Sequence, residues 1–157
     1  MKAMPTLEGG LRIDSEDVND WGILRSILGD ANRSPLDLAS RLGGWMTQEA
    51  GAEDWSEYVV PDLREGFQDE LAQVAASIET AVFHAGGGPG PIWITREDVL
   101  PWYSSLNQAR LALEDQFSFG SSETLDSGNL PPEPQAAWMR SKFYCAIQGL
   151  LLAHVMR

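Results

Sequence analysis

The chain has 157 residues, with 23 acidic and 11 basic side chains, and its net charge of −12 excludes a basic footprint for nucleic acid. The hydrophobic fraction of 43% and six tryptophans are typical of a packed core. No apolar run reaches the roughly 20 residues that span a bilayer, and the N-terminus lacks the apolar stretch of a signal peptide. We expect one cytoplasmic domain over residues 1–157, with no direct contact to nucleic acid or membranes.

Acidic side chains are concentrated in the first half of the chain. Residues 1–80 hold 16 acids and 6 bases, whereas residues 81–157 hold 7 acids and 5 bases. This distribution favours solubility, and a basic protein partner is the alternative interpretation. The single Cys145 excludes an intramolecular disulfide and fits a reducing compartment. Because it lies in an apolar helical stretch, we expect a small buried side chain, with a reactive thiol as the alternative.

Residues 10–14 alternate between apolar and polar, which predicts a short strand. Asp14 or Ser15 is expected to cap the helix that follows. Gly29 is expected to end this helix, because glycine adopts the left-handed backbone of a helix C-terminus at little cost. Its apolar side is predicted to hold Val18, Trp21, Leu24 or Arg25, and Leu28.

A second helix is predicted to begin at residues 34–37. Ser34 is the expected cap, Pro35 has no amide to leave unpaired, and Asp37 meets the positive end of the helix dipole. The helix is expected to end at residues 43–44, both glycine. The next segment, residues 45–58, mixes aromatic and acidic side chains, which is explained by amphipathic packing or, alternatively, by a binding surface.

Residues 61 to about 84 are predicted to form the longest helix, whose apolar residues follow one another by fours and threes. At 1.5 Å per residue it would span roughly 36 Å. The run of glycine and proline at residues 86–91 ends it. Residues 92–94 alternate again and are predicted to pair with residues 11–13 as a two-stranded antiparallel ribbon, which needs helices packed on it.

The best-patterned stretch begins at Thr95 and continues to about Phe117. Thr95 is expected to cap the amide of Asp98, whose carboxylate reaches back to Thr95. Pro101 would remove a bond inside this helix. Either the helix kinks there, or the first turn is separate and Pro101 opens the main helix. The apolar row at helical spacing consists of Trp102, Leu106, Ala109 and Leu113.

Residues 118–134 show no periodicity and are rich in Ser, Gly, Asp and Pro, so we expect a long surface loop. The last helix is predicted over about residues 134–156 and is apolar on most sides. Such a helix is buried at the centre of a fold or at a subunit interface. Together these elements predict a mainly α-helical bundle of about five helices.

The candidate binding residues lie on the best-patterned helix and are Trp102, Asn107, Arg110 and Glu114. The last three share a face beside the apolar row, and Arg110 and Glu114 are spaced to pair, which contributes a few tenths of a kcal/mol on an exposed helix. Our first interpretation is that Asn107 and Arg110 tie this helix to a neighbouring backbone. The alternative is a ligand or partner site.

No other pattern indicates catalysis, a metal or a cofactor. His84 and His154 have no second His or Cys at ligand spacing, and the glycine-rich stretch lacks the Gly-Lys-Ser/Thr of a phosphate loop. No Gly-x-Ser-x-Gly nucleophile elbow is present. We therefore expect no bound metal or cofactor, and the balance is against an enzyme.

The pattern Trp102-x-x-x-Leu106-Asn107-x-x-Arg110-Leu111-x-Leu113 resembles the signature helix of an uncharacterised bacterial domain family. That family includes the actinobacterial oxidative-stress regulator AosR. The resemblance implies a regulatory protein that acts through other proteins, transcription machinery among them. AosR-like redox sensing uses a Cys-x-x-x-Cys pair, which the single Cys145 does not supply.

These observations favour a non-catalytic protein-interaction or regulatory module, linked to transcription or stress regulation, that forms a homodimer through the C-terminal helix. The alternative is a small-molecule-binding protein or enzyme with a pocket near Trp102, Asn107 and Arg110.

Overall fold

The computed structural model describes residues 1–46, 50–82, 89–121 and 124–156. The predicted mainly helical bundle of about five helices is confirmed. In chain order the elements are β1 (Lys2–Pro5), β2 (Leu11–Asp14), α1 (Val18–Ala31), α2 (Leu38–Trp45), the single turn α3 (Ala52–Asp54), the π-helix η1 (Trp55–Val59), α4 (Val60–Val82), β3 (Ile92–Ile94), α5 (Val99–Phe117), the 3-10 turn η2 (Ser127–Asn129) and α6 (Pro132–His154).

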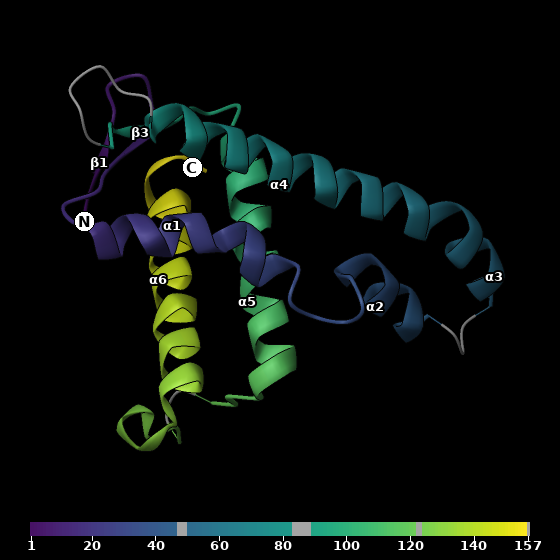
Figure 1. Cartoon of the computed structure of the whole chain (residues 1–157). Coiled ribbons are helices and arrows are strands. Elements are labelled where there is room, and N and C mark those ends of the chain that lie inside the picture. The colour runs from purple at the N-terminus through teal and green to yellow at the C-terminus, as the bar shows by residue number, and fades with distance from the viewer. Residues whose placement is uncertain (47–49, 83–88, 122–123, 157) are drawn as a thin grey trace.

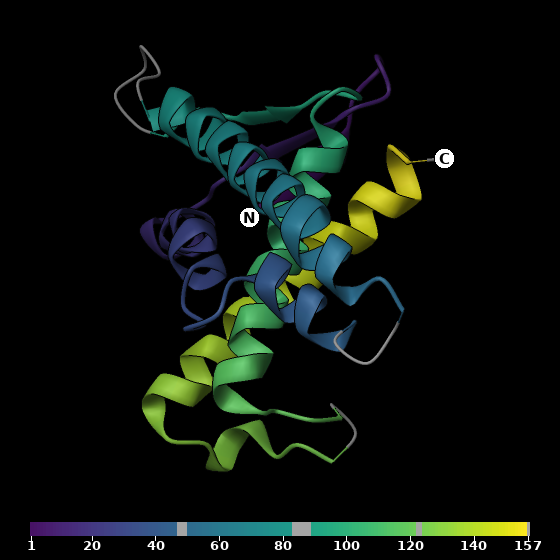
Figure 2. The same cartoon turned by 90° about the vertical axis from the view of Figure 1, so that its right-hand side faces the viewer.

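The helix α5 lies at the centre, because α1, α4 and α6 all pack against it. Figure 1 shows α4 crossing α5 near the start of α5, and Figure 2 shows α6 crossing α5 at an oblique angle. The whole apolar row predicted for this helix is buried, so it forms the middle of the core. The helix with the clearest apolar row in the sequence is therefore the structural centre of the bundle.

The small sheet is antiparallel and has the order β1-β2-β3. The predicted pairing of residues 11–13 with residues 92–94 is confirmed, with Leu11 opposite Ile94 and Ile13 opposite Ile92. These four side chains are buried against the helices. The third strand, β1, was not predicted, because its side chains are mostly exposed and carry no alternation of burial. Gly9 has φ +83° in the β1–β2 turn, a backbone conformation that glycine adopts without a Cβ penalty.

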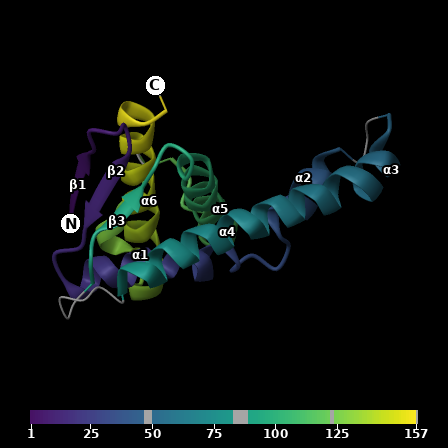
Figure 3. The ribbon, with the colours of Figure 1, turned by 90° about the horizontal axis from the view of Figure 1, so that it is seen from above.

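The first half of α4 extends away from α5 and carries α2, α3 and η1 (Figures 1 and 3). We call this region, residues 38–46 and 50–70, the arm. The sheet and the α2–α3 region lie at opposite ends of α4 (Figure 3). The body consists of the sheet, α1, α5, α6 and the second half of α4.

The expected boundaries of α1 need correction at both ends. Asp17, not Asp14 or Ser15, is the N-cap, and its carboxylate accepts a hydrogen bond from the amide of Asp20 at 2.9 Å. Gly29 lies inside the helix, which continues to Ala31. The buried face holds Trp21, Leu24 and Ile27, whereas Val18 and Leu28 are exposed.

The helix α2 begins later than predicted, because Asp37 is its cap. The carboxylate of Asp37 accepts from the amide of Ser40 at 2.7 Å, whereas the hydroxyl of Ser34 donates to Asp115. The glycine pair does not end the helix. A Cβ at Gly43 would lie 2.6 Å from Cγ2 of Val60, so this glycine allows α2 to approach α4 closely.

The position of Pro101 is explained by a separate turn before α5. Thr95 and Asp98 form the predicted reciprocal cap: Oδ2 of Asp98 accepts from the amide and the hydroxyl of Thr95, at 3.1 and 2.7 Å. The helix then begins at Val99, which places Pro101 in its first turn. A proline there costs no internal bond, since the first amides of a helix are free.

The helix α6 begins at Pro132, slightly earlier than predicted, and η2 lies inside the predicted loop of residues 118–134. Its buried face holds Ala137, Tyr144, Ile147, Gln148 and Leu151 and packs on α5. Its opposite face is exposed to solvent. The sequence offered two alternatives for this helix, burial at the centre of the fold or at a subunit interface. Because one face is exposed, α6 is not buried on all sides at the centre of the fold.

Candidate functional site

Trp102 does not belong to a surface site. Its side chain is 1% exposed within the core, and its indole Nε1 is buried with no hydrogen-bond partner among the described residues. The other candidate residues lie further along α5. Asn107 is half-buried and Glu114 is exposed. The structure therefore does not bring Trp102 into one pocket with Asn107 and Arg110.

Arg110 connects α5 with α6. Its Nη1 donates to Oε1 of Gln148 at 2.6 Å, and Nε2 of Gln148 donates back to the carbonyl of Tyr103 at 3.1 Å. The Nε of Arg110 is buried and has no partner in the described part of the chain. The expected pair between Arg110 and Glu114 is absent from the ion pairs of the described residues. Glu114 instead accepts from the amide of Gly120 at 3.0 Å.

A cavity of about 160 Å³ opens beside this contact, between α5, α6 and the segment after α5. We call it the α5–α6 cavity. It is lined by Arg110, Glu114, Phe119, Gly120, Trp138, Ser141, Lys142 and Cys145. The Lys142 ammonium lies 5.2 Å from the centre of the Trp138 ring. Two cations and a hydroxyl can attract a small anion, against the repulsion of the Glu114 carboxylate in the same lining. Asn107 does not line the cavity.

Cys145 is exposed, which corrects the expectation that it is buried. Tyr144 and Ile147 occupy the face of α6 that packs on α5, and Cys145 falls on the other side. The sequence did not distinguish the two faces because both are rich in apolar residues. The exposed face contains Met139, Lys142, Cys145, Ala146, Gly149, Leu152 and Met156, which we call the α6 face.

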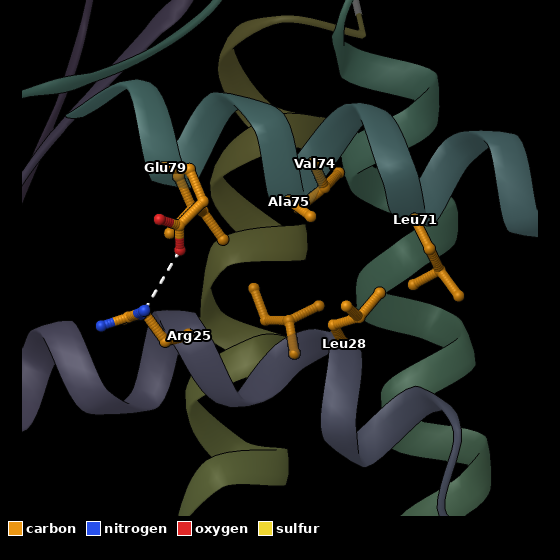
Figure 4. Close-up of a pocket in the computed structure, with 8 residues that line it drawn as sticks. Arg25, Leu28, Leu71, Val74, Ala75 and Glu79 are labelled. Atoms are coloured by element: carbon orange, nitrogen blue, oxygen red, sulfur yellow. Dashed lines mark hydrogen bonds and ion pairs between the residues drawn. The ribbon is translucent and has the colours of Figure 1, made fainter. Parts of the chain in front are cut away.

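A second cavity, of about 150 Å³, lies between α1 and α4 (Figure 4). Its floor is aliphatic, and Arg25 and Glu79 face each other across one end with Nη2 and Oε1 3.2 Å apart. Leu28 contributes an exposed edge. This cavity has room for one apolar side chain, but it does not gather polar groups that would position a reacting substrate.

The most extensive buried polar network joins α1 to α6 and was not predicted. Asp30 is 2% exposed, and its carboxylate accepts from Nε and Nη2 of Arg140 at 2.7 and 2.9 Å. The Tyr144 hydroxyl donates to the same carboxylate at 2.7 Å, and Arg33 lies 3.3 Å away. Arg140 and Tyr144 lie 110 and 114 positions after Asp30 in the sequence, so no local pattern predicts the network.

The network changes the acidity of its members. Burial, and next the charge of Asp30, raise the pKa of Tyr144 above its ordinary value. The hydrogen bond to Asp30 raises the pKa of the Arg140 guanidinium, against a smaller opposing effect of burial. Tyr144 therefore remains a neutral donor, and the arrangement holds two helices together without providing a base.

Metal binding and membrane insertion find no support in the described residues. No group of three or more His, Cys, Asp or Glu side chains is placed to hold a metal ion in this part of the chain. No helix among the described residues is long and apolar enough to cross a membrane. The expectation for His84 lies outside the described residues, and His154 is exposed near the end of α6.

The fold and these sites define a mainly helical domain with a small antiparallel sheet, organised around one central helix. The chain belongs to a family described as a domain of unknown function, DUF2017, whose pattern matches residues 24–155. This confirms the resemblance at the level of an uncharacterised family, and nothing links the chain to AosR specifically. No curated protein and no solved structure matches the chain.

Proposed function

We propose that this protein is a non-catalytic interaction module that forms a homodimer through the α6 face. The observation that carries the proposal is the exposure of apolar side chains on a helix whose other face is already packed. Met139 is 57% exposed and Leu152 is 49% exposed. Exposed apolar side chains that gather on one face of a helix are typical of interaction sites on soluble proteins.

The spacing on α6 suits a partner helix. Exposed or half-buried residues recur at positions 139, 142, 146, 149, 153 and 156, alternating between three and four residues. This spacing keeps one side of a helix facing a neighbour. Cys145, Gly149 and Ala153 are small and follow one another by four, and an added Cβ at Gly149 would meet nothing within 4 Å. Small residues at this spacing allow two helix backbones to approach closely.

Charge favours a second copy at this face. Two chains of net charge −12 repel each other wherever their carboxylates meet. From Pro134 to the C-terminus the sequence contains no acidic residue. Two copies that meet through α6 after its first turn, which holds Glu133, therefore bring no carboxylate of that helix into the contact.

A regulatory role is part of the proposal. The resemblance of the signature helix to the family that includes AosR supports a protein that acts through other proteins, in stress or transcription regulation. The single Cys145 does not supply a Cys-x-x-x-Cys switch, so the proposed module regulates by binding. A cytoplasmic location fits the exposed thiol.

Sedimentation equilibrium of the purified chain tests the dimer. We expect a monomer–dimer equilibrium that Leu152→Glu weakens by about tenfold or more, since it brings two carboxylates into the contact. The matched control is Leu100→Glu on α5, because Leu100 is similarly exposed, at 62%, and lies outside the α6 face. A wild-type chain that remains monomeric, or an equal effect of both variants, would contradict the proposal.

Binding of a small anion in the α5–α6 cavity is the second candidate function. It is favoured by the two cations, Arg110 and Lys142, that line one cavity with Ser141. Thermal unfolding in a panel of small carboxylates and phosphates tests it, because a ligand that binds only the folded chain raises the midpoint. The candidate fails if no anion raises the midpoint of the wild type more than that of Lys142→Gln.

A further inference from the structure

An open apolar groove of about 300 Å³ follows one side of the arm, opposite the end of the molecule that carries the sheet. We call it the α4 groove. It is lined by Val59, Asp62, Leu63, Gly66, Phe67 and Glu70. These residues follow one another by three, one and three along the helix, so they share a face of η1 and α4. Val59, Leu63 and Phe67 are only half-buried.

Gly66 forms an opening in the middle of this face. It is exposed, and a Cβ added there would meet no heavy atom within 4 Å. A glycine inside a helix costs about 1 kcal/mol relative to alanine. At Gly43 the cost is offset, because the missing side chain lets α2 approach Val60. Gly66 makes no such internal contact. What Gly66 provides is access to the apolar side chains on either side of it.

The rim of the groove is acidic and has no free base. Asp62 and Glu65 are exposed on α4 and make no ion pair with another described residue. The two arginines of the arm are already engaged, Arg64 with Asp37 at 2.7 Å and Arg41 with Asp115 at 3.7 Å. The rest of α4 after Arg64 contains no basic residue. Tyr58, one turn before Asp62, is 62% exposed.

From this combination we infer that the α4 groove is a docking site for a basic amphipathic helix of a partner protein. Apolar side chains on one stripe of that helix enter the groove, and flanking lysines or arginines meet the rim carboxylates. Helix-in-groove recognition uses anchors spaced by three and four residues, and the apolar groove residues Val59, Leu63 and Phe67 are four residues apart. A second copy that met the groove through its own acidic arm would be repelled by the carboxylates around the groove.

A lysine–leucine peptide of about 18 residues, whose leucines form one helical stripe, is the probe. Fluorescence anisotropy of the labelled peptide measures its affinity for the full chain. A peptide of the same composition, reordered so that the leucines form no stripe, controls for attraction by charge alone. We expect the striped peptide to bind at least about tenfold more tightly. Equal affinity of the two peptides would overturn the proposal.

Two glycine substitutions locate the binding site. Gly66→Arg fills the groove and is expected to weaken binding by about tenfold or more. Gly22→Arg is the matched control, because Gly22 is an exposed helix glycine on α1 with equally open surroundings and the charge change is the same. Equal weakening by both variants means diffuse attraction and overturns the proposal.

A second pair of variants tests the rim. Asp62→Asn with Glu65→Gln removes one carboxylate that lines the groove and the exposed carboxylate three residues further along α4. Glu8→Gln with Glu97→Gln removes two exposed carboxylates in the sheet region. Only the first pair is expected to weaken binding beyond about twofold. Leu152→Glu is expected to bind the peptide as the wild type does, so failure of the dimer and failure of the groove give different results.

Discussion

Among the ion pairs that join helices in the described part of the chain, one in the body and one in the arm share the same closest distance. Asp30 and Arg140 connect α1 to α6, and Asp37 and Arg64 connect the start of α2 to α4. In both, the carboxylate lies 2.7 Å from the Nε of the arginine. The side chains are 3% and 18% exposed in the body pair but 46% and 40% exposed in the arm pair.

The two pairs have the same closest distance, but they differ in burial and in the number of bonds that the carboxylate accepts from the arginine. In the body, Asp30 also accepts from Tyr144. Removing the carboxylate leaves the Arg140 guanidinium without its acceptor and leaves the Tyr144 hydroxyl only the longer contact to the carbonyl of Ile23, at 3.3 Å. Uncompensated buried charge is costly, whereas exposed pairs contribute little because water and salt screen them. In the arm, the main task of Asp37 is to cap α2 through the amide of Ser40.

The difference implies that the two regions open separately. The body is held by contacts among α1, α5 and α6, whereas α2 packs mainly on α4. Elements with few buried neighbours open at a lower free energy than the core does. A rigid body with a more easily opened arm fits a molecule whose proposed binding surfaces lie on α6 and on α4.

The largest expected effect comes from breaking the body pair. Asp30→Ala should lower the free energy of unfolding by about 3–5 kcal/mol, because Arg140 remains inside without its carboxylate. Urea unfolding followed by circular dichroism measures this value. Asp37→Ala is the matched substitution in the arm and should cost clearly less in the same assay. Equal losses for the two variants would show that burial does not separate the two pairs.

Tyr144→Phe should have the next largest effect. It removes the hydroxyl that donates to Asp30 at 2.7 Å and leaves the ring packed against α5. We expect a loss of about 1–2 kcal/mol in urea unfolding, the cost of one hydrogen bond to a charged group. Tyr103→Phe is the control, since Tyr103 is only half-buried and makes no hydroxyl bond to a described residue. A Tyr144→Phe chain as stable as the wild type would mean that the carboxylate is satisfied by Arg140 alone.

Local periodicity predicted the elements that bury one face. The row from Trp102 to Leu113 and the pairing of residues 11–13 with residues 92–94 were found because apolar side chains recur at the helical or strand period. The strand β1 was missed because its residues are mostly exposed. An exposed strand is held in place by backbone hydrogen bonds to its neighbour, and such bonds leave no hydrophobic pattern in its own sequence.

The sites depended more on contacts between distant residues. Arg110 was expected to bond to a neighbouring backbone, but it donates to the side chain of Gln148, which lies 38 positions away within an apolar helix. The buried position of Asp30 was not predicted, because Asp30 follows a glycine near the end of α1 and its partners are on α6. The exposure of Cys145 was not foreseen, since apolar residues on both faces of α6 hide which one packs.

Breaking the arm pair should have a smaller and more local effect. Asp37→Ala removes the cap of α2 and the partner of Arg64, and we expect a loss of about 1 kcal/mol. Hydrogen exchange should become faster at the amides of Ser40 and Arg41 and remain unchanged in α5. Asp69→Ala, which removes an exposed carboxylate of α4, should leave both regions unchanged. Faster exchange throughout α5 would contradict independent opening of the arm.

The smallest expected effect is a pH dependence confined to α2. Partial desolvation opposes ionisation of Asp37, but the Ser40 amide and the Arg64 guanidinium outweigh it and hold the pKa of Asp37 below its ordinary value of 3.8. Because the pKa is lower in the folded chain, the carboxylate stabilises α2 fully above the ordinary value, and this contribution is lost as pH falls through the folded-state value. Asp37→Asn lacks the titration, so the difference in α2 amide exchange between wild type and variant should be constant near neutral pH and shrink only below about pH 4. A difference that disappears already near neutral pH would assign the stabilisation of α2 to another group.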